Sequence, residues 1–238
     1  DVQIRSQRAG TVGNGYVVGQ INAIVDPFAY FLSCKNITES DGGEDAATDD
    51  EYYELMRASQ DAFSTAGPKG GYIYIAKQVS TKIADVVANR PSAGKVALYV
   101  LMDDGTIAKQ ETKSAVLAAC SEDSKRPLTD FVEVKDPQTV VYNIAFTYYI
   151  PSESTSSSAN IEEAVDAAVQ EYVQWQSAKL GRDINPSKLI GLLMQTGIKR
   201  VVLTSPDFTD LKDGSDNTAP QVAEVGEITA TNGGHEDE

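Results

Sequence analysis

The chain has 238 residues, of which 41% are hydrophobic, and it carries a formal net charge of −15 at pH 7. This length and apolar content allow one large domain or two to three small ones, and they argue against a chain that is disordered throughout. The acidic balance argues against a nucleic-acid partner, because binding to a phosphate backbone requires clustered Lys and Arg. No apolar run approaches the roughly 20 residues that span a bilayer, and the N-terminus lacks the features of a signal peptide. We therefore expect a soluble protein that is not secreted and does not contact a membrane.

Few residues are suited to catalysis or metal binding. Cys34 and Cys120 are far apart and lack a C-x-x-C partner, so neither a zinc cluster nor a disulfide framework is predicted. The only histidine, His235, lies in a polar stretch at the end of the chain. A Ser-His-Asp or Cys-His mechanism needs an imidazole held beside its nucleophile. We therefore expect no enzyme, no cofactor and no small-molecule substrate.

The first 40 residues predict a β-rich segment. Residues 16–25 and 28–37 are rich in β-branched and aromatic side chains, and Asp26-Pro27 between them favours a turn. The glycine-rich stretch at 10–15 superficially suggests a phosphate-binding loop. It leads into a β-like run instead of a helix, so a tight turn is the favoured interpretation.

An acidic loop, Asp41 to Asp45, precedes a predicted helix that Thr48 or Asp49 can cap. The spacing of the loop carboxylates does not match an EF-hand, and a solvated loop is favoured over a calcium site. A calcium-stabilised adhesion module stays an alternative. Apolar and small residues at helical spacing predict one buried stripe on the helix: Tyr52, Leu55, Met56, Ser59 and Phe63.

Residues 41–136 predict a middle α+β domain. Its expected elements after the first helix are a helix or strand at 71–80, strands at 82–88 and 95–102, a helix at 111–120 and a strand at 131–134. A helix is favoured at 71–80. The Arg90 to Gly94 stretch is typical of a turn between the two central strands.

Residues 137–231 predict a C-terminal α+β domain, in which helices cover one face of a small mixed sheet. Its expected elements are strands at 139–150, 200–204 and 222–229, a helix from Asn160 to Gly181, and a helix that Asn185-Pro186 begins. Asn160 and Glu163 have the spacing of a capping box. The residues assigned to one buried face of the first strand are Val141, Ile144, Phe146 and Tyr148. Residues 232–238 are polar and predict a disordered tail.

Six residues are candidates for contacts with a partner. Trp175 lies off the main apolar stripe of the long helix, and Tyr172 is its aromatic neighbour; each is either core or an interface anchor. Two charged pairs could fix the start of a strand and the end of a helix, or be ordinary surface charge: Arg126 with Asp130, and Arg182 with Asp183.

Several short motifs follow one another in a recognisable order. Segment 9–61 combines the glycine-rich turn, an alternating strand, Asn36-Ile37-Thr38, Gly42-Gly43-Glu44-Asp45 and a helix that starts Thr-Asp-Asp-Glu. Three further motifs are RPLTDFVEV at 126–134, LGRDI at 180–184 and GIKRVVLTSP at 197–206. In this order they resemble the J family of contractile-tail baseplate proteins, from Ala9 to Thr229.

The resemblance implies a structural component of a baseplate wedge in a phage, prophage or tailocin, with a more distant likeness to type VI secretion baseplates. Its partners would be other wedge and hub proteins, with self-association in a ring. It would be located in the virion tail baseplate, and in the host cytoplasm during assembly. The family brings no catalytic residues. Because the chain begins at Asp1 without methionine, we expect the family's N-terminal portion, which contributes assembly contacts, to be truncated.

The fold class is therefore expected to be α+β, with small mixed sheets each backed by helices and preceded by a β-rich segment. The alternative function is a carbohydrate-active or sugar-binding acidic domain, which the acidity and scattered aromatic residues suggest. A glycosidase needs two facing carboxylates, and the sequence singles out no such pair.

Overall fold

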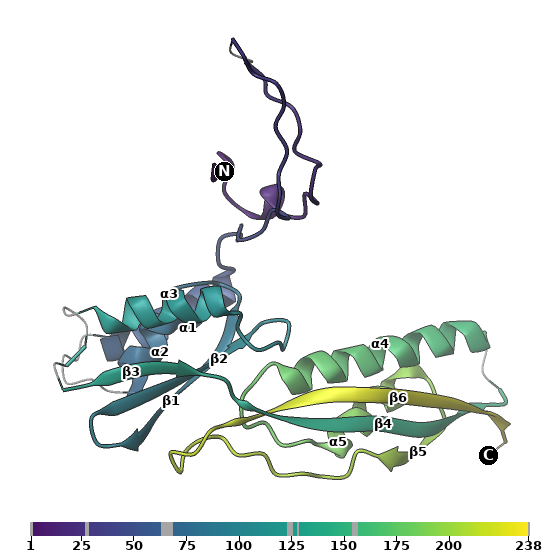
Figure 1. Cartoon of the computed structure of the whole chain (residues 1–238). Helices are drawn as coiled ribbons and strands as arrows, with labels where there is room; N and C mark the ends of the chain where they lie inside the picture. The colour runs from purple at the N-terminus through teal and green to yellow at the C-terminus, as the bar shows by residue number, and fades with distance from the viewer. Residues whose placement is uncertain are drawn as a thin grey trace. The chain divides into compact units, whose positions relative to one another are not determined.

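The computed structural model describes residues 2–26, 29–62, 69–122, 126–127, 129–153 and 157–237. It separates into two compact units, Asp1–Glu54 and Leu55–Glu238. The second unit contains two three-stranded sheets with their helices. This is the α+β arrangement that the sequence predicts (Figure 1).

The N-terminal unit is not β-rich. Among its described residues before Asp49, the only regular element is the 3-10 turn η1, Thr11–Gly13. The chain folds back on itself (Figure 1), and single backbone bonds join the two predicted strands, such as Gly19 N to Asn36 O at 3.0 Å. The Asn36 side chain replaces the next ladder bonds, since its Oδ1 accepts from Ile21 N and its Nδ2 donates to Val17 O. A side chain thus bridges the two segments where a strand pair was predicted; Pro27 of the predicted turn lies outside the described residues.

Hydrogen bonds join the glycine-rich turn to the acidic loop. The Asn14 side chain and the Gly43 backbone exchange two hydrogen bonds of 2.8 and 2.9 Å. The Asp45 carboxylate accepts from the N–H and the hydroxyl of Thr11 at 3.0 and 2.9 Å. A Cβ on Gly43 would lie 2.4 Å from the carbonyl oxygen of Gly10, so only glycine fits there. This bonding accounts for the position of Asp45 without a cation.

Helix α1, Asp49–Ala62, begins where its capping residues predict. Its predicted buried stripe is wrong for Tyr52 and Met56, which are 64% and 53% exposed. Phe63 at the end of that stripe lies outside the described residues. Leu55 and Ser59 of that stripe are half-buried.

The first sheet has the order β1-β2-β3, with β1 Ile83–Ser92, β2 Lys95–Met102 and β3 Phe131–Lys135. β1 is antiparallel to β2, and β3 is parallel to it. Helices α2, Lys69–Lys77, and α3, Gln110–Ser121, pack on this sheet. The structure confirms the predicted strands and the helical interpretation of 71–80. The predicted turn from Arg90 to Gly94 is wrong in its extent, because β1 continues to Ser92, which pairs with Lys95. The core between helices and sheet contains Tyr72, Ala76, Leu98, Val100, Val116 and Cys120.

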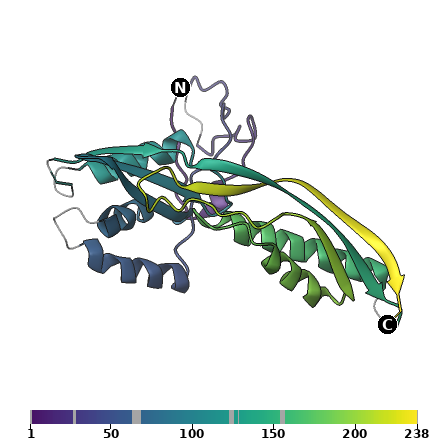
Figure 2. The ribbon, with the colours of Figure 1, turned by 90° about the horizontal axis from the view of Figure 1, so that it is seen from below.

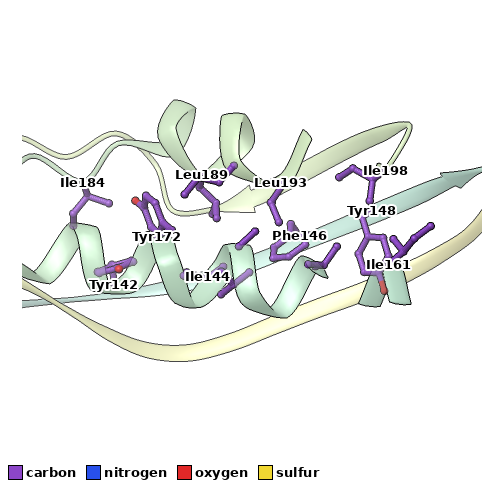
Figure 3. Close-up of a cluster of buried hydrophobic side chains, with 14 of the residues drawn as sticks. Tyr142, Ile144, Phe146, Tyr148, Ile161, Tyr172, Ile184, Leu189, Leu193 and Ile198 are labelled. Atoms are coloured by element: carbon purple, nitrogen blue, oxygen red, sulfur yellow. The ribbon is translucent and has the colours of Figure 1, made fainter. Parts of the chain in front are cut away.

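The second sheet has the order β5-β4-β6, with β4 Gln138–Pro151, β5 Arg200–Ser205 and β6 Gln221–Glu236. β4 is antiparallel to β5 and parallel to β6. Helices α4, Ser158–Ser177, and α5, Pro186–Leu193, followed by η2, Met194–Thr196, lie on one side of this sheet (Figure 2). Alternate residues of β4 face them and are buried (Figure 3): Tyr142, Ile144, Phe146, Tyr148 and Ile150. Val141 is out of phase and 66% exposed, so assigning it to this face was wrong.

Side-chain capping explains where α4 and α5 begin. Asn185 caps α5 as predicted, its side chain accepting from Ser187 N at 3.0 Å, with Pro186 as the first helical residue. The predicted capping box of α4 is wrong. The N-cap lies three residues earlier than predicted, at Ser157, whose side chain accepts from Asn160 N at 3.3 Å.

The predicted disordered tail is also wrong for residues 232–236, which belong to β6. β4 is long enough to pair with them, as far as Pro151 opposite Glu236. The Glu236 carboxylate also accepts two hydrogen bonds from the Arg200 guanidinium, at 2.7 and 2.8 Å. Pairing with β4 compensates for the polar sequence.

A third buried cluster joins the two sheets. It comprises Ala97, Tyr99 and Leu101 of β2 with Leu180 and Val222 of the C-terminal part. β2 is therefore buried on both faces, which explains its nearly continuous apolar sequence.

Candidate interaction sites

The predicted anchor Trp175 lies near the C-terminal end of α4 and is half-buried. The Arg182 guanidinium lies 4.3 Å from its ring centroid, and Lys188 Nζ lies 5.7 Å from it. Arg182 Nη1 also donates to the carbonyl oxygen of Trp175. Burial lowers the pKa of Arg182, and the nearby carboxylate of Asp85 opposes that shift. The cluster combines an aromatic ring with two cations, a grouping stabilised by about 0.5–2 kcal/mol for each good cation–π contact.

Tyr172 is not available to a partner. It is 0% exposed and its ring meets that of Tyr142 edge-on, with centroids 6.3 Å apart (Figure 3). Burial raises its pKa to about 12, and the nearby backbone of Asn185 opposes the shift. The core interpretation therefore holds, and Tyr172 as an interface residue is wrong.

Arg182 and Asp183 organise the connection between α4 and α5. The Gln176 side chain donates from Nε2 to both of their carbonyl oxygens, at 2.9 and 3.1 Å. Asp183 Oδ1 accepts from Leu211 N at 2.8 Å. Gln176 is itself 0% exposed, and sequence reasoning missed it. The signal was a polar residue four positions after Tyr172, on the buried stripe.

Arg126 and Asp130 fix the connection between α3 and β3. Arg126 donates to the carbonyl oxygens of Ser121 and Asp130, at 3.1 and 2.6 Å. Asp130 Oδ2 accepts from the Tyr72 hydroxyl at 2.9 Å. Burial and this contact with Asp130 raise the pKa of Tyr72. The pair thus has the structural role that the sequence suggested, through a backbone oxygen, and a contact with a partner stays a prediction.

A second exposed cluster, which sequence reasoning missed, lies at the end of the second sheet. The Arg200 guanidinium stacks 3.8 Å from the ring centroid of Tyr149 while it binds Glu236. A Cβ on Gly233 would lie 2.5 Å from the Tyr149 ring, so that ring lies over the glycine. The hydrogen bonds with Glu236 raise the pKa of Arg200 and lower that of Glu236.

Metal-binding clusters and membrane-spanning helices are absent from the residues that the structure describes. The described residues contain no group of three or more His, Cys, Asp or Glu side chains that could hold a metal ion. None of the described helices combines the length and apolar character needed to cross a membrane.

Two family models match the part of the chain that forms the sheets. The Baseplate J-like central domain matches residues 64–136, and the Baseplate J-like protein C-terminal domain matches residues 142–231. Together they match more than half of the chain, in the order expected. The chain belongs to the Baseplate J-like family.

A sequence relative of this Baseplate J-like chain comes from a phage. The chain is 28% identical to Baseplate protein J of Escherichia phage P2 over 160 residues, 67% of this chain and 52% of that protein. The chain thus spans about half the length of the curated relative. A chain in the 6-fold symmetrised cryo-EM structure of the anti-feeding prophage baseplate matches with a TM-score of 0.50 and 15% identity. That match covers 87% of this chain and 47% of the other, and at this identity it shows a shared fold alone.

Proposed function

We propose that this chain is a structural component of a contractile-tail baseplate wedge, in which it holds neighbouring proteins in place through protein–protein contacts. The observation that carries the proposal is the ordered pair of Baseplate J-like domains, which covers both sheets. Its partners are other wedge and hub proteins, together with further copies of itself in a ring. It assembles in the host cytoplasm and becomes part of the tail of a phage, prophage or tailocin.

Contacts between the two sheets support a scaffold role. The two sheets share a buried cluster and are also tied by hydrogen bonds from Arg90 N to Asn217 Oδ1 and from Leu180 N to Asp85 Oδ2, both at 3.0 Å. Buried contacts of this kind resist movement between sheets, whereas domains linked by a flexible segment would swing. We infer two domains, 41–136 and 137–231, whose sheets are held in a fixed orientation.

The N-terminal unit supports the same proposal. None of its described side chains is buried, and several large apolar ones are exposed. The most exposed are Val2, Val25, Tyr30 and Leu32, at 87%, 93%, 99% and 95%. Apolar surface of this extent favours burial against another protein.

Mass spectrometry of purified tails tests the proposal. We expect peptides from all parts of this chain in assembled tails, and loss of assembled tails when its gene is disrupted. Complementation with the wild-type chain should restore them, while Trp175→Ala tests the half-buried anchor at the end of α4. Tails that assemble normally and contain no peptide of this chain would refute the proposal.

A further inference from the structure

The strand β6 has an unpaired outer edge along most of its length. It lies beyond β4 at the margin of the second sheet (Figure 2), and every residue from Gly226 to His235 is exposed. Long exposed edges are uncommon in monomeric proteins, because their free N–H and C=O groups can pair with another chain. The outer edge of β6 is therefore a candidate for pairing with a strand of another chain.

The ladder between β4 and β6 shows which way the backbone groups of β6 point. Gln138 N–H donates to the carbonyl oxygen of Pro220, so Gln138 directs its backbone groups toward β6. Its register partner Gln221 directs its own groups away from β4, where they bond to Lys212 O and Gly181 N at 2.8 and 2.7 Å. Along a strand this direction alternates from residue to residue.

The same alternation reaches the middle of β6. The residues of β4 that share the direction of Gln138 include Ile144, Phe146 and Tyr148. Their register partners on β6 are Ile228, Ala230 and Asn232. The backbone groups of these three residues therefore point away from β4. No backbone group of another described element pairs with them.

Two register shifts bound this free edge. One lies between Val225 and Ile228, where Asn143 Oδ1 accepts from Glu227 N at 2.9 Å, and the other between Asn232 and His235. Bulges disturb an edge and protect it from pairing. Between the bulges, residues 228–232 are in continuous register and contain no charge and no proline, so this window lacks the usual protection.

The surroundings of the window are acidic. Glu224 and Glu227 are exposed on β6 itself. On the helix side, Glu162 and Asp166 of α4 lie near Tyr148, the register partner of Asn232, and their charges add to burial in raising the pKa of Tyr148. A second copy of the window would bring the same carboxylates with it, in a chain of net charge −15. Like charges at this position disfavour a symmetric pair and favour a basic partner.

We propose that residues 228–232 of β6 accept an extended strand of a different protein, whose side chains toward α4 are Lys or Arg. The backbone of the incoming strand pairs with Ile228, Ala230 and Asn232, which supplies affinity without sequence preference. Specificity comes from basic side chains placed at every second position, opposite Glu162 and Asp166. This goes beyond the proposed function, since it assigns one edge and one class of partner.

A peptide titration tests the proposal. The probe is a seven-residue peptide that alternates lysine and valine, added to the full isotope-labelled chain and followed by NMR. We expect saturable shifts of the amides of Ile228, Ala230 and Asn232, and at least tenfold weaker binding of a peptide that alternates glutamate and valine. Absence of saturable shifts, or equal binding of both peptides, would overturn the proposal.

Two variants separate backbone pairing from charge. Ala230→Pro removes an outward N–H and leaves the β4 ladder intact, as edge prolines do, and should abolish binding, whereas Ala230→Thr should retain it. Glu162→Lys with Asp166→Lys should weaken the lysine peptide and strengthen the glutamate peptide. Binding that survives Ala230→Pro, or ignores the charge reversal, would overturn the proposal. Because the isolated chain is used, that failure leaves the presence of the chain in tails untouched.

Discussion

Asp85 Oδ2 accepts a hydrogen bond from the backbone N–H of Leu180 at 3.0 Å, and so joins β1 of the first sheet to the segment that follows α4. Its other oxygen accepts from Val86 N at 2.9 Å. One carboxylate thus bonds to backbone N–H groups of both halves of the second unit, close to Arg182, whose pKa it affects.

Replacing Asp85 should loosen the contact between the sheets. In Asp85→Ala the Leu180 N–H loses its partner, and we expect the free energy of unfolding to fall by about 1–3 kcal/mol. Chemical denaturation measures this. Asp207→Ala, at an exposed position, is the matched control and should change stability by less than about 0.5 kcal/mol. Equal stability of the two variants would contradict the role given to Asp85.

Replacement by alanine should lower the free energy of unfolding far more at Tyr172 than at Trp175, the two aromatic residues near the end of α4. Tyr172→Ala removes a fully buried ring and should cost about 3–5 kcal/mol, because a cavity replaces it. Trp175→Ala removes a half-buried ring and its contacts with Arg182 and Lys188, and should cost less. Urea unfolding of both variants gives the comparison. A greater loss for Trp175→Ala would contradict the core assignment of Tyr172.

Two glycine substitutions should act in opposite directions. Gly43→Ala would bring a Cβ to 2.4 Å from Gly10 O, and should open the contact between the glycine-rich turn and the acidic loop. Gly191→Ala faces open space inside α5 and should stabilise the chain by up to about 1 kcal/mol. Hydrogen exchange at Gly43 N–H and thermal unfolding report the two effects. If the amide at position 43 stays protected in Gly43→Ala, the turn tolerates the added carbon.

The stability of the C-terminal end of β6 should decrease at acid pH. The pKa of Glu236 is below its ordinary value of 4.5, mainly through its hydrogen bonds with Arg200. The folded state therefore binds this proton less readily than the unfolded state. Its stabilisation is present above pH 4.5 and is lost as pH falls through the lowered pKa. The protection of the amides at residues 232–236, taken relative to the intrinsic exchange rate at each pH, should fall in acid, and Glu236→Gln should remove that pH dependence; an unchanged profile in the variant would disprove the link.

Local chemistry allowed much of the second unit to be predicted from the sequence. Asn185-Pro186 marks a helix start because the capping side chain and the fixed φ of proline act within a few residues. The tail at 232–236 was missed because its stability comes from the far end of β4, which local polarity does not reveal. The unit before Asp49 was misjudged for a related reason, since Asn36 uses its side chain where a ladder bond was expected.

The candidate site was predicted only in part. Trp175 was identified from its position off the apolar stripe, but its cations Arg182 and Lys188 come from the next connection and helix, which periodicity within α4 cannot place. The register with β4 decides which backbone groups of β6 point outward, so the sequence of residues 228–232 alone cannot predict them. Long-range pairing is the information that a single sequence lacks.

The step from β3 to β4 takes only Asp136 and Pro137, and Pro137 is buried. A two-residue connection with a fixed φ, set beside the cluster of Tyr99, Leu101 and Val222, leaves no slack for bending. A force applied to the second sheet would thus be transmitted to the first sheet, and the two sheets would rotate together as one rigid body.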